Sequence, residues 1–226
     1  MKTSATPRRS GRFGRVVARA SLTLAVGLAV VPVTAGTASA GLLSPIVSTL
    51  LPSCAPRPTS TAFQQWGDSS NYFLMPNGGF ESGTSGWVTT PGVGIASDNE
   101  SFHINGANDA HSLTMGTAQV VASPTVCVSM GENTIRMFVK GSGVATSVLH
   151  VQAFVQNRLT GLVLSTGFDI RGTAGVTGWA PSPRMYIPNL LGGVLATQNL
   201  TLVFSTSGPP ATWNIDDVYV DPFKSR

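Results

Sequence analysis

The carboxylates best placed for chemistry lie at the two ends of one β-rich region. Glu81 follows an Asn-Gly pair at Asn77, a strong turn signal because both residues tolerate positive φ. Asp216 and Asp217 stand side by side near the C-terminus. Adjacent acids repel each other and have low β propensity. A bound cation or a hydrogen-bond network would offset that repulsion.

Two motifs carry a family resemblance. Residues 77–81 read Asn-Gly-Gly-Phe-Glu, with Gly-Trp at 86–87, and residues 215–220 read Ile-Asp-Asp-Val-Tyr-Val. Together they resemble the jelly-roll carbohydrate-binding modules of the galactose-binding-like superfamily, over roughly residues 73–222. The resemblance implies a structural Ca²⁺ ion held by Glu81 and by Asp216 or Asp217. The alternative is that these carboxylates accept backbone N–H bonds and fix the chain ends.

A second resemblance lies ahead of the Gly-Phe-Glu motif. The order Cys…Phe…Trp-Gly-Asp…Tyr in residues 54–72 is similar to the opening of uncharacterised secreted actinobacterial proteins. This likeness implies no function.

The stretch 98–111 is the most polar part of the β-rich region. It holds a group of oxygen donors: Asp98, Asn99, Glu100, Asn108 and Asp109. Hard cations such as Ca²⁺ prefer six to eight oxygen ligands. No Asp-x-Asp-x-Asp-Gly signature is present, so we expect a solvated loop here.

The sequence contains no complete catalytic signature. Glycoside hydrolysis needs a pair of carboxylates, but Asp216 and Asp217 are expected to face opposite sides of a strand. There is no Gly-x-Ser-x-Gly or His-x-x-x-His motif and no phosphate-binding loop. The three histidines, at 103, 111 and 150, are scattered. We therefore predict a protein that is not an enzyme, with a small secreted hydrolase as a remaining alternative.

Residues 1–40 are typical of a signal peptide. Five arginines precede an apolar run at 22–33, and Ala38-Ser39-Ala40 is a small-x-small cleavage site, so cleavage is predicted after Ala40. The arginine pair at 8–9 leaves twin-arginine export as an alternative to general secretion. The chain carries formal charge +4, but without this segment 8 basic and 10 acidic residues remain, a net of −2. The basic balance is therefore no sign of nucleic-acid binding.

A linker rich in Pro, Ser and Thr is predicted at 41–62, followed by one domain at 63–226. The only two cysteines are Cys54 and Cys127, and an even count in an exported chain indicates a disulfide. A lipid-attachment role for Cys54 is the alternative. We predict no membrane span in the exported chain and a monomer.

Short β-rich segments with turns between them fill the domain. They are 93–97, 112–122, 125–130, 134–140, 144–156, 160–170, 177–187, 200–206 and 212–220. This pattern predicts an all-β fold, an antiparallel β-sandwich of jelly-roll type.

Several side chains are candidates for ligand binding. Alternation in 148–155 places His150, Gln152 and Phe154 on the face of a strand opposite the core. The aromatic candidates are Trp66, Trp87, Trp179 and Tyr186. For each of them, packing onto the domain or exposure without a ligand is the alternative.

The function that we predict is a secreted binding module for carbohydrate, such as a cell-wall polymer, or another extracellular polymer. The alternative is a structural or surface protein without a small ligand. Low charge with many Ser, Thr and Gly residues is the sequence feature that favours this alternative.

Overall fold

The computed structural model describes residues 54–129, 132, 134–188 and 197–221. All of them belong to one compact unit, residues 40–226. The predicted signal peptide, its cleavage site and residues 41–53 of the predicted linker lie outside the described residues. In the part of the chain that is described, no helix is long and apolar enough to cross a membrane.

The described residues form thirteen strands and one short 3₁₀ helix, η1 (Gln64–Trp66). The strands are β1 (Phe73–Leu74), β2 (Val88–Thr89), β3 (Gly94–Ala96), β4 (Ser112–Met115), β5 (Val120–Ala122), β6 (Val126–Val128), β7 (Thr134–Lys140), β8 (Val148–Asn157), β9 (Val163–Arg171), β10 (Trp179–Pro181), β11 (Met185–Tyr186), β12 (Gln198–Ser207) and β13 (Trp213–Asp221).

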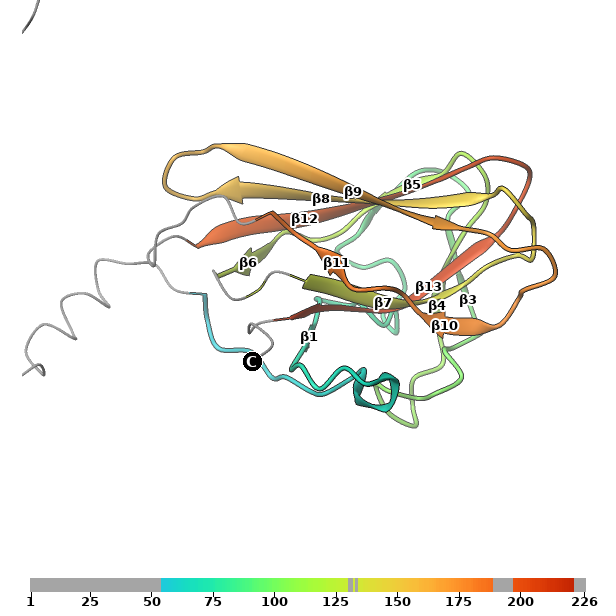
Figure 1. Ribbon diagram of the computed structural model, residues 1–226, viewed down its shortest axis with the longest axis horizontal. Helices are drawn as coiled ribbons and strands as arrows, with labels where there is room; N and C mark the ends of the chain where they lie inside the picture. Colours follow the sequence, from blue (N-terminus) through green and yellow to red (C-terminus); the bar gives the residue numbers. More distant parts are fainter. Residues whose placement is uncertain (1–53, 130–131, 133, 189–196, 222–226) are drawn as a thin grey trace, which may run out of the picture. The chain divides into compact units, whose positions relative to one another are not determined.

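These strands make two antiparallel sheets that face each other (Figure 1). The seven-stranded sheet has the order β10-β7-β13-β4-β3, with β1 on β13 and β11 on β7. The six-stranded sheet has the order β2-β5-β12-β8-β9, with β6 on β12. The chain passes repeatedly from one sheet to the other, and the predicted antiparallel jelly-roll sandwich is confirmed.

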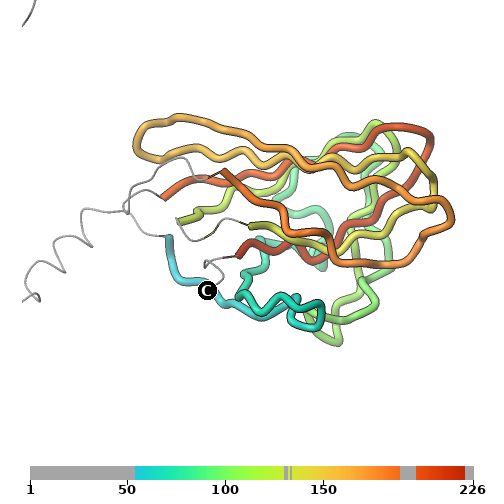
Figure 2. Tube along the Cα trace, viewed as in Figure 1, coloured from blue at the N-terminus to red at the C-terminus, as the bar shows by residue number. Residues whose placement is uncertain are grey.

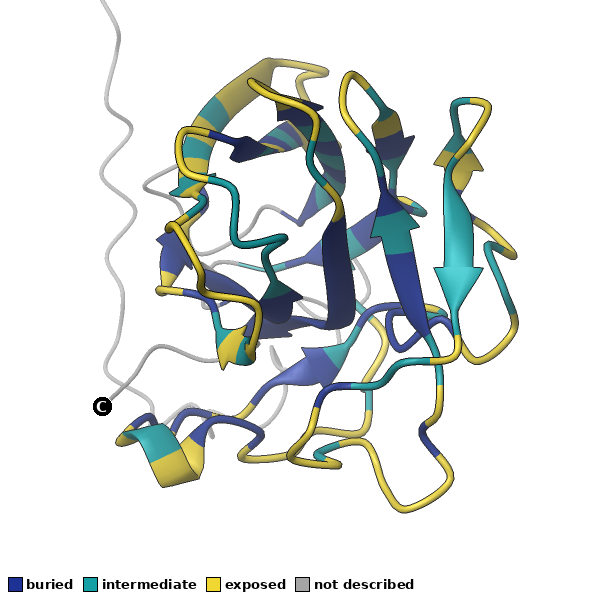
Figure 3. Cartoon of the chain, turned by 90° about the vertical axis from the view of Figure 1, so that its right-hand side faces the viewer, coloured by how far each residue is buried: buried dark blue, intermediate teal, exposed yellow. Residues whose placement is uncertain are grey.

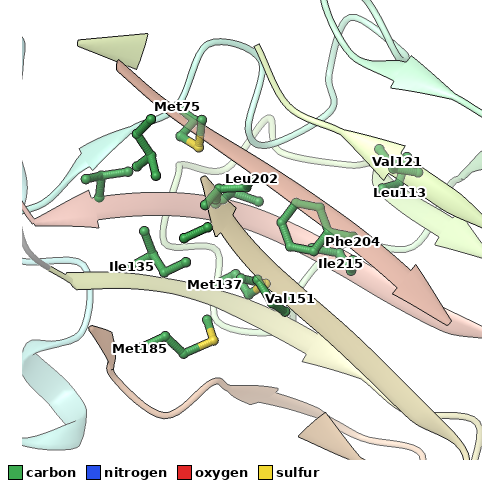
Figure 4. Packing of buried hydrophobic residues seen from close by; sticks show 14 of the residues in the cluster. Met75, Leu113, Val121, Ile135, Met137, Val151, Met185, Leu202, Phe204 and Ile215 are labelled. Carbon is green, nitrogen blue, oxygen red and sulfur yellow. The ribbon is translucent and has the colours of Figure 1, made fainter. Parts of the chain in front are cut away.

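The core lies between the sheets because strand residues alternate between buried and outward-facing positions. Along β8, Leu149, Val151, Ala153 and Val155 are completely buried, as the sequence predicted. Leu202 and Phe204 of β12 and Ile135 and Met137 of β7 meet them in the same cluster (Figure 4). The strands carry most of the buried residues (dark blue), and the connecting loops carry most of the exposed ones (Figure 3).

Two predicted segments are each divided into two strands. Residues 112–122 form β4 and β5, because a turn in which Ala118 has φ 61° separates them. Residues 177–187 form β10 and β11, with Pro183 in the gap. Proline has no backbone N–H to donate to a ladder, which favours a break there.

The N-terminal segment 54–72 covers the outer side of the seven-stranded sheet (Figures 1 and 2). Phe63 stacks on Phe138 of β7 at 5.2 Å between ring centroids and meets Tyr219 of β13 edge-on at 5.7 Å. Tyr72 is buried against the same group. Cys54 forms the predicted disulfide with Cys127 of β6, 73 residues away, so the lipid-attachment alternative does not apply. Aromatic burial and the disulfide both fix this segment to the domain.

Candidate cation site and binding surfaces

Three buried acids converge beside the middle of β13, where Asp217 lies. Glu100, Asp109 and Asp217 each place a carboxylate oxygen within 4.8 Å of the other two. Glu100 and Asp217 have no exposed surface, and Asp109 is 6% exposed. We call these three residues the acidic cluster.

A break in the β-ladder positions Asp217. The register between β13 and β7 shifts between Asp216 and Tyr219, and Asp217 adopts φ 48°, a left-handed conformation uncommon for a residue other than glycine. Both Asp216 and Asp217 are completely buried and lie against the 98–111 loop. The expectation that they face opposite sides of a strand is wrong, because the bulge interrupts the two-residue alternation.

The turn at residues 77–79 packs directly on this bulge. Val218 donates its N–H to Gly78 O and accepts the Met75 N–H at its carbonyl, with N···O distances of 3.1 and 2.9 Å. A Cβ atom on Gly78 would lie 2.9 Å from Val218 O, so the contact requires glycine. The two end motifs of the sequence therefore meet in space.

Glu100 is held by backbone groups of its own loop and by Asp216. Its carboxylate accepts the N–H groups of Phe102 and Ile104. Its own N–H donates to Asp216 Oδ2 at 3.1 Å. The solvated loop expected here is wrong for Glu100 and Asp109, which long-range contacts bury.

Asp109 and Asp217 lack such support. Within the described residues, neither carboxylate oxygen of Asp217 has a hydrogen-bond partner, and those of Asp109 have none at full hydrogen-bond geometry, although Glu81 and Asn105 lie close to Asp109. Gly79 lies beside them, and a Cβ atom there would be 3.0 Å from Asp217 Oδ1 and 3.3 Å from Asp109 Oδ1. Buried polar atoms without partners are rare in native proteins, so these oxygens point to a ligand.

The electrostatics agree with that geometry. Burial, together with the negative charges of Asp216 and Asp109, raises the pKa of Asp217 to about 9. Burial likewise raises the pKa of Asp216 to about 8, and burial with the nearby Glu81 raises the pKa of Asp109 to about 6. Several buried carboxylates are thus close together, and among the described residues none of their hydrogen-bonding partners is a basic side chain. Oxygen-only donors of this kind fit Ca²⁺.

The three predicted metal ligands have different surroundings. Asp217 belongs to the acidic cluster, and Asp216 braces it by accepting the N–H groups of Glu100 and Asp217. Glu81 is exposed and accepts the N–H groups of Ala110 and His111 at 2.8 and 2.7 Å. These bonds and that to the His111 ring outweigh burial and lower the pKa of Glu81. Glu81 therefore fixes the loop next to Asp109.

Two of the predicted aromatic residues lie in a patch on the outer side of the seven-stranded sheet. Trp66 packs edge-on against Phe102 at 4.8 Å, and both rings lie within 5.7 Å of Phe138. Phe102 is 37% exposed, and Trp66 and Trp179 are partly exposed.

A polar pair adjoins these rings. Asp98 accepts the Trp179 Nε1–H at 3.5 Å and pairs with Lys140 Nζ at 2.7 Å. We call Trp66, Phe102, Trp179, Asp98 and Lys140 the aromatic patch.

The other predicted ligand residues lie elsewhere. Trp87 is buried in the core, where its Nε1–H donates to Pro76 O. Tyr186 is 60% exposed on β11, opposite Thr134. His150, Gln152 and Phe154 face outward on the six-stranded sheet, as alternation predicted.

Sequence reasoning singled out Glu100 and Asp109 only as members of a polar loop, and it did not identify Phe102, Asp98 or Lys140 as parts of a patch. The available signal was the density of acids in 98–109 around the single aromatic residue Phe102.

No protein-family model matches the sequence, and no curated protein matches it. Solved structures with similar folds include TmCBM61 in complex with β-1,4-galactotriose, at 17% identity and TM-score 0.41, covering 67% of this chain and 98% of that one. A family 16 carbohydrate-binding module has 12% identity and TM-score 0.40, covering 65% and 98%. The CBM22-1 xylan-binding domain of Paenibacillus barcinonensis Xyn10C has 14% identity and TM-score 0.40, covering 63% and 89%. These values concern the fold and carry no information on the ligand of this chain.

Proposed function

We propose that the protein is a secreted module that binds an extracellular glycan at the aromatic patch. The observation that carries this proposal is that one loop serves two sites. Residues 98–111 supply Glu100 and Asp109 to the acidic cluster and Asp98 and Phe102 to the aromatic patch. A cation bound at the acidic cluster would therefore hold Asp98 and Phe102 of the aromatic patch in place for the glycan.

The chemistry of the patch suits a neutral, hydroxylated polymer. Partly exposed aromatic rings offer apolar surface at a low entropic cost, and a sugar ring has apolar C–H faces to place against them. Asp98 and Lys140 are 40% and 32% exposed at their side chains, so they are accessible to sugar hydroxyl groups. A carboxylate accepts hydrogen bonds from such groups, and an ammonium group donates to them.

We propose Ca²⁺ as the cation, with Glu100, Asp109 and Asp217 as the residues that would hold it. A bound Ca²⁺ ion would supply positive charge that keeps these carboxylates ionised while buried. The chain's own contribution is the bulge at Asp217 and the backbone bonds to Glu100 and Glu81, which keep the oxygens together. Export through the segment 1–40 forms part of this proposal.

The test is a glycan screen with the purified chain, in Ca²⁺ and in EDTA, read by quenching of tryptophan fluorescence and by calorimetry. We expect binding that weakens in EDTA and that Trp179→Ala abolishes. Phe154→Ala, an aromatic substitution on the other sheet, is the matched variant and should leave affinity unchanged.

The opposite pattern, with loss in Phe154→Ala alone, would move binding to the six-stranded sheet and overturn the patch assignment. Absence of binding to every extracellular glycan tested would favour a structural or surface protein without a small ligand.

A further inference from the structure

Three neighbouring strands bring a serine, a histidine and an aspartate together on the outer side of the six-stranded sheet. His150 of β8 lies directly opposite Asp169 of β9, and Ser207 is the last residue of β12. His150 Nδ1 is 2.6 Å from Asp169 Oδ1, and His150 Nε2 is 2.7 Å from Ser207 Oγ. The two ring nitrogens of one imidazole thus contact an acid on one side and a hydroxyl group on the other.

The acid decides which nitrogen carries the proton. A carboxylate accepts a hydrogen bond, so the proton of a neutral imidazole resides on Nδ1, which faces Asp169. Nε2 then has a free lone pair directed at Ser207, and the hydroxyl group donates to it. This is the arrangement in which a serine hydroxyl group becomes a nucleophile, with a base beside it and a third group that orients the base.

The site is open to solvent. Ser207 is exposed, and the side chains of His150 and Asp169 are 37% and 46% exposed. Arg171 Nη2 lies 3.7 Å from Asp169 Oδ2, which helps to hold the carboxylate beside the imidazole. The β-ladders between β12, β8 and β9 already join these strands along their length, so they do not depend on the side-chain bonds.

We propose that Ser207, His150 and Asp169 form a nucleophilic site that hydrolyses carboxylic esters. Ser207 Oγ forms a bond to the carbonyl carbon while its proton passes to His150 Nε2. The bond from that carbon to the alkoxy oxygen breaks, and the alcohol leaves with the proton from Nε2. Water then attacks the acyl-serine, His150 takes the water proton and returns it to Ser207 Oγ, and the carboxylic acid departs.

The surrounding face indicates the substrate class. Beyond His150 along β8, the outward side chains are the uncharged Gln152 and Phe154. Gly167 lies opposite Gln152 on β9 and leaves that position without a side chain. Because the surface beyond Asp169 and Arg171 is open and uncharged, it fits a short acyl ester of a neutral hydroxylated compound. This activity is independent of the aromatic patch, which lies on the other sheet.

The test uses a fluorophosphonate probe on the purified chain, with mass spectrometry to locate the modified residue, and p-nitrophenyl acetate for turnover. We expect modification at Ser207, complete loss in Ser207→Ala, and a labelling rate about 100-fold lower in His150→Gln, since a general base contributes roughly 10²–10⁴-fold. Ser205→Ala removes the neighbouring outward hydroxyl group of β12 and should label as the parent does.

Absence of labelling at Ser207 in the folded parent chain would overturn the proposal. Labelling of Ser207 that is unchanged in His150→Gln would also overturn it, because the histidine would then not act as the base. Unchanged thermal midpoints of the variants show that each chain is folded. Glycan binding does not enter this assay, so its result is separate from that of the glycan screen.

Discussion

Asp68 and Asp217 are both buried carboxylates, at 2% and 0% exposure, yet their surroundings are opposite. Asp68 pairs with Arg136 at 2.8 Å and with Arg184 at 2.6 Å, and it accepts the Tyr72 hydroxyl group at 2.7 Å. Asp217 has unpartnered oxygens and other acids as neighbours. The first site contains its own counter-charges, and the second has none among the described residues.

The pKa values show the same contrast. Burial acts to raise the pKa of Asp68, but its bonds to Arg184, Tyr72 and Arg136 outweigh burial and hold that pKa well below its usual range. At Asp217 burial and neighbouring negative charge act in the same direction, and the pKa rises to about 9. Two buried acids of one chain therefore differ in the direction of their pKa shift because of the charges beside them.

The largest expected effect is at Asp68, whose positively charged partners belong to the chain itself. Asp68→Ala leaves the buried Arg136 charge without its partner, and breaking a buried pair in this way costs about 3–5 kcal/mol. Denaturant unfolding measures this loss, which we expect to be the same with and without Ca²⁺.

The matched variant is Asp98→Ala, which breaks the half-exposed pair with Lys140 and should cost about 0–1 kcal/mol. Similar small losses in both variants would show that the Asp68 network does not tie the N-terminal segment to the sheet.

The second prediction addresses the acidic cluster. With Ca²⁺ at 100 times its dissociation constant, the parent chain should gain about 2.7 kcal/mol by mass action. Asp217→Asn removes one ligand charge and should lose most of that gain, whereas in EDTA it should be at least as stable as the parent, because a buried unpaired carboxyl group is gone. Thermal unfolding with and without EDTA measures both.

Asp169→Asn, a change at an exposed acid on the other sheet, should keep the full response to Ca²⁺. If Ca²⁺ changes the stability of none of the three chains, the cation assignment is wrong.

Much of the fold could be predicted because the strands and turns of a β-sandwich have local sequence signals. Alternation along 148–155 gave the correct faces of β8, and turn residues marked most strand ends. The disulfide followed from the cysteine count and the expected export. The bulge at Asp217 could not be predicted, since it depends on the ladders with β7 and on the turn at Gly78.

The candidate sites depend on contacts that have no local sequence signal. The bond from the Glu100 N–H to Asp216 joins residues 116 positions apart and buries an acid that the sequence places in a polar loop. Ser207 and His150 meet across 57 residues and only in one strand register. Neither arrangement could be derived from spacing, because each requires the pairing of strands to be known.

A third prediction separates the two carboxylate sites by pH in EDTA. The folded-state pKa values of Asp216 and Asp217, about 8 and 9, lie above the usual value of 3.8, so their contribution is full at low pH and is lost as pH rises toward those values. Unfolding free energy should thus fall by several kcal/mol from pH 5 to pH 8, since each group that is protonated only in the folded chain contributes a slope of about 1.4 kcal/mol per pH unit.

Asp68 has the opposite sign, because its lowered pKa gives stability above pH 4 that is lost only in acid. It should contribute no slope between pH 5 and pH 8. Saturating Ca²⁺, which binds the ionised carboxylates, should abolish the fall. A slope that is the same in EDTA and in Ca²⁺ would have to come from groups outside the acidic cluster.

The smallest expected effect is at Gly79, where a single methyl group would enter the space beside the unpartnered oxygens. A Cβ atom there would lie 2.9 Å from Asn105 Nδ2 and 3.0 Å from Asp217 Oδ1, so one of these groups must move. We expect Gly79→Ala to weaken Ca²⁺ binding about tenfold, which is in the range for changes next to metal ligands. Gly178→Ala is the matched control, because a Cβ atom at Gly178 meets nothing within 4 Å. Calorimetric titration of both variants with Ca²⁺ decides the point: if Gly79→Ala binds as the parent does, the cation does not sit beside Asp217 Oδ1, and the comparison with Asp68 would have to be explained without a bound ion.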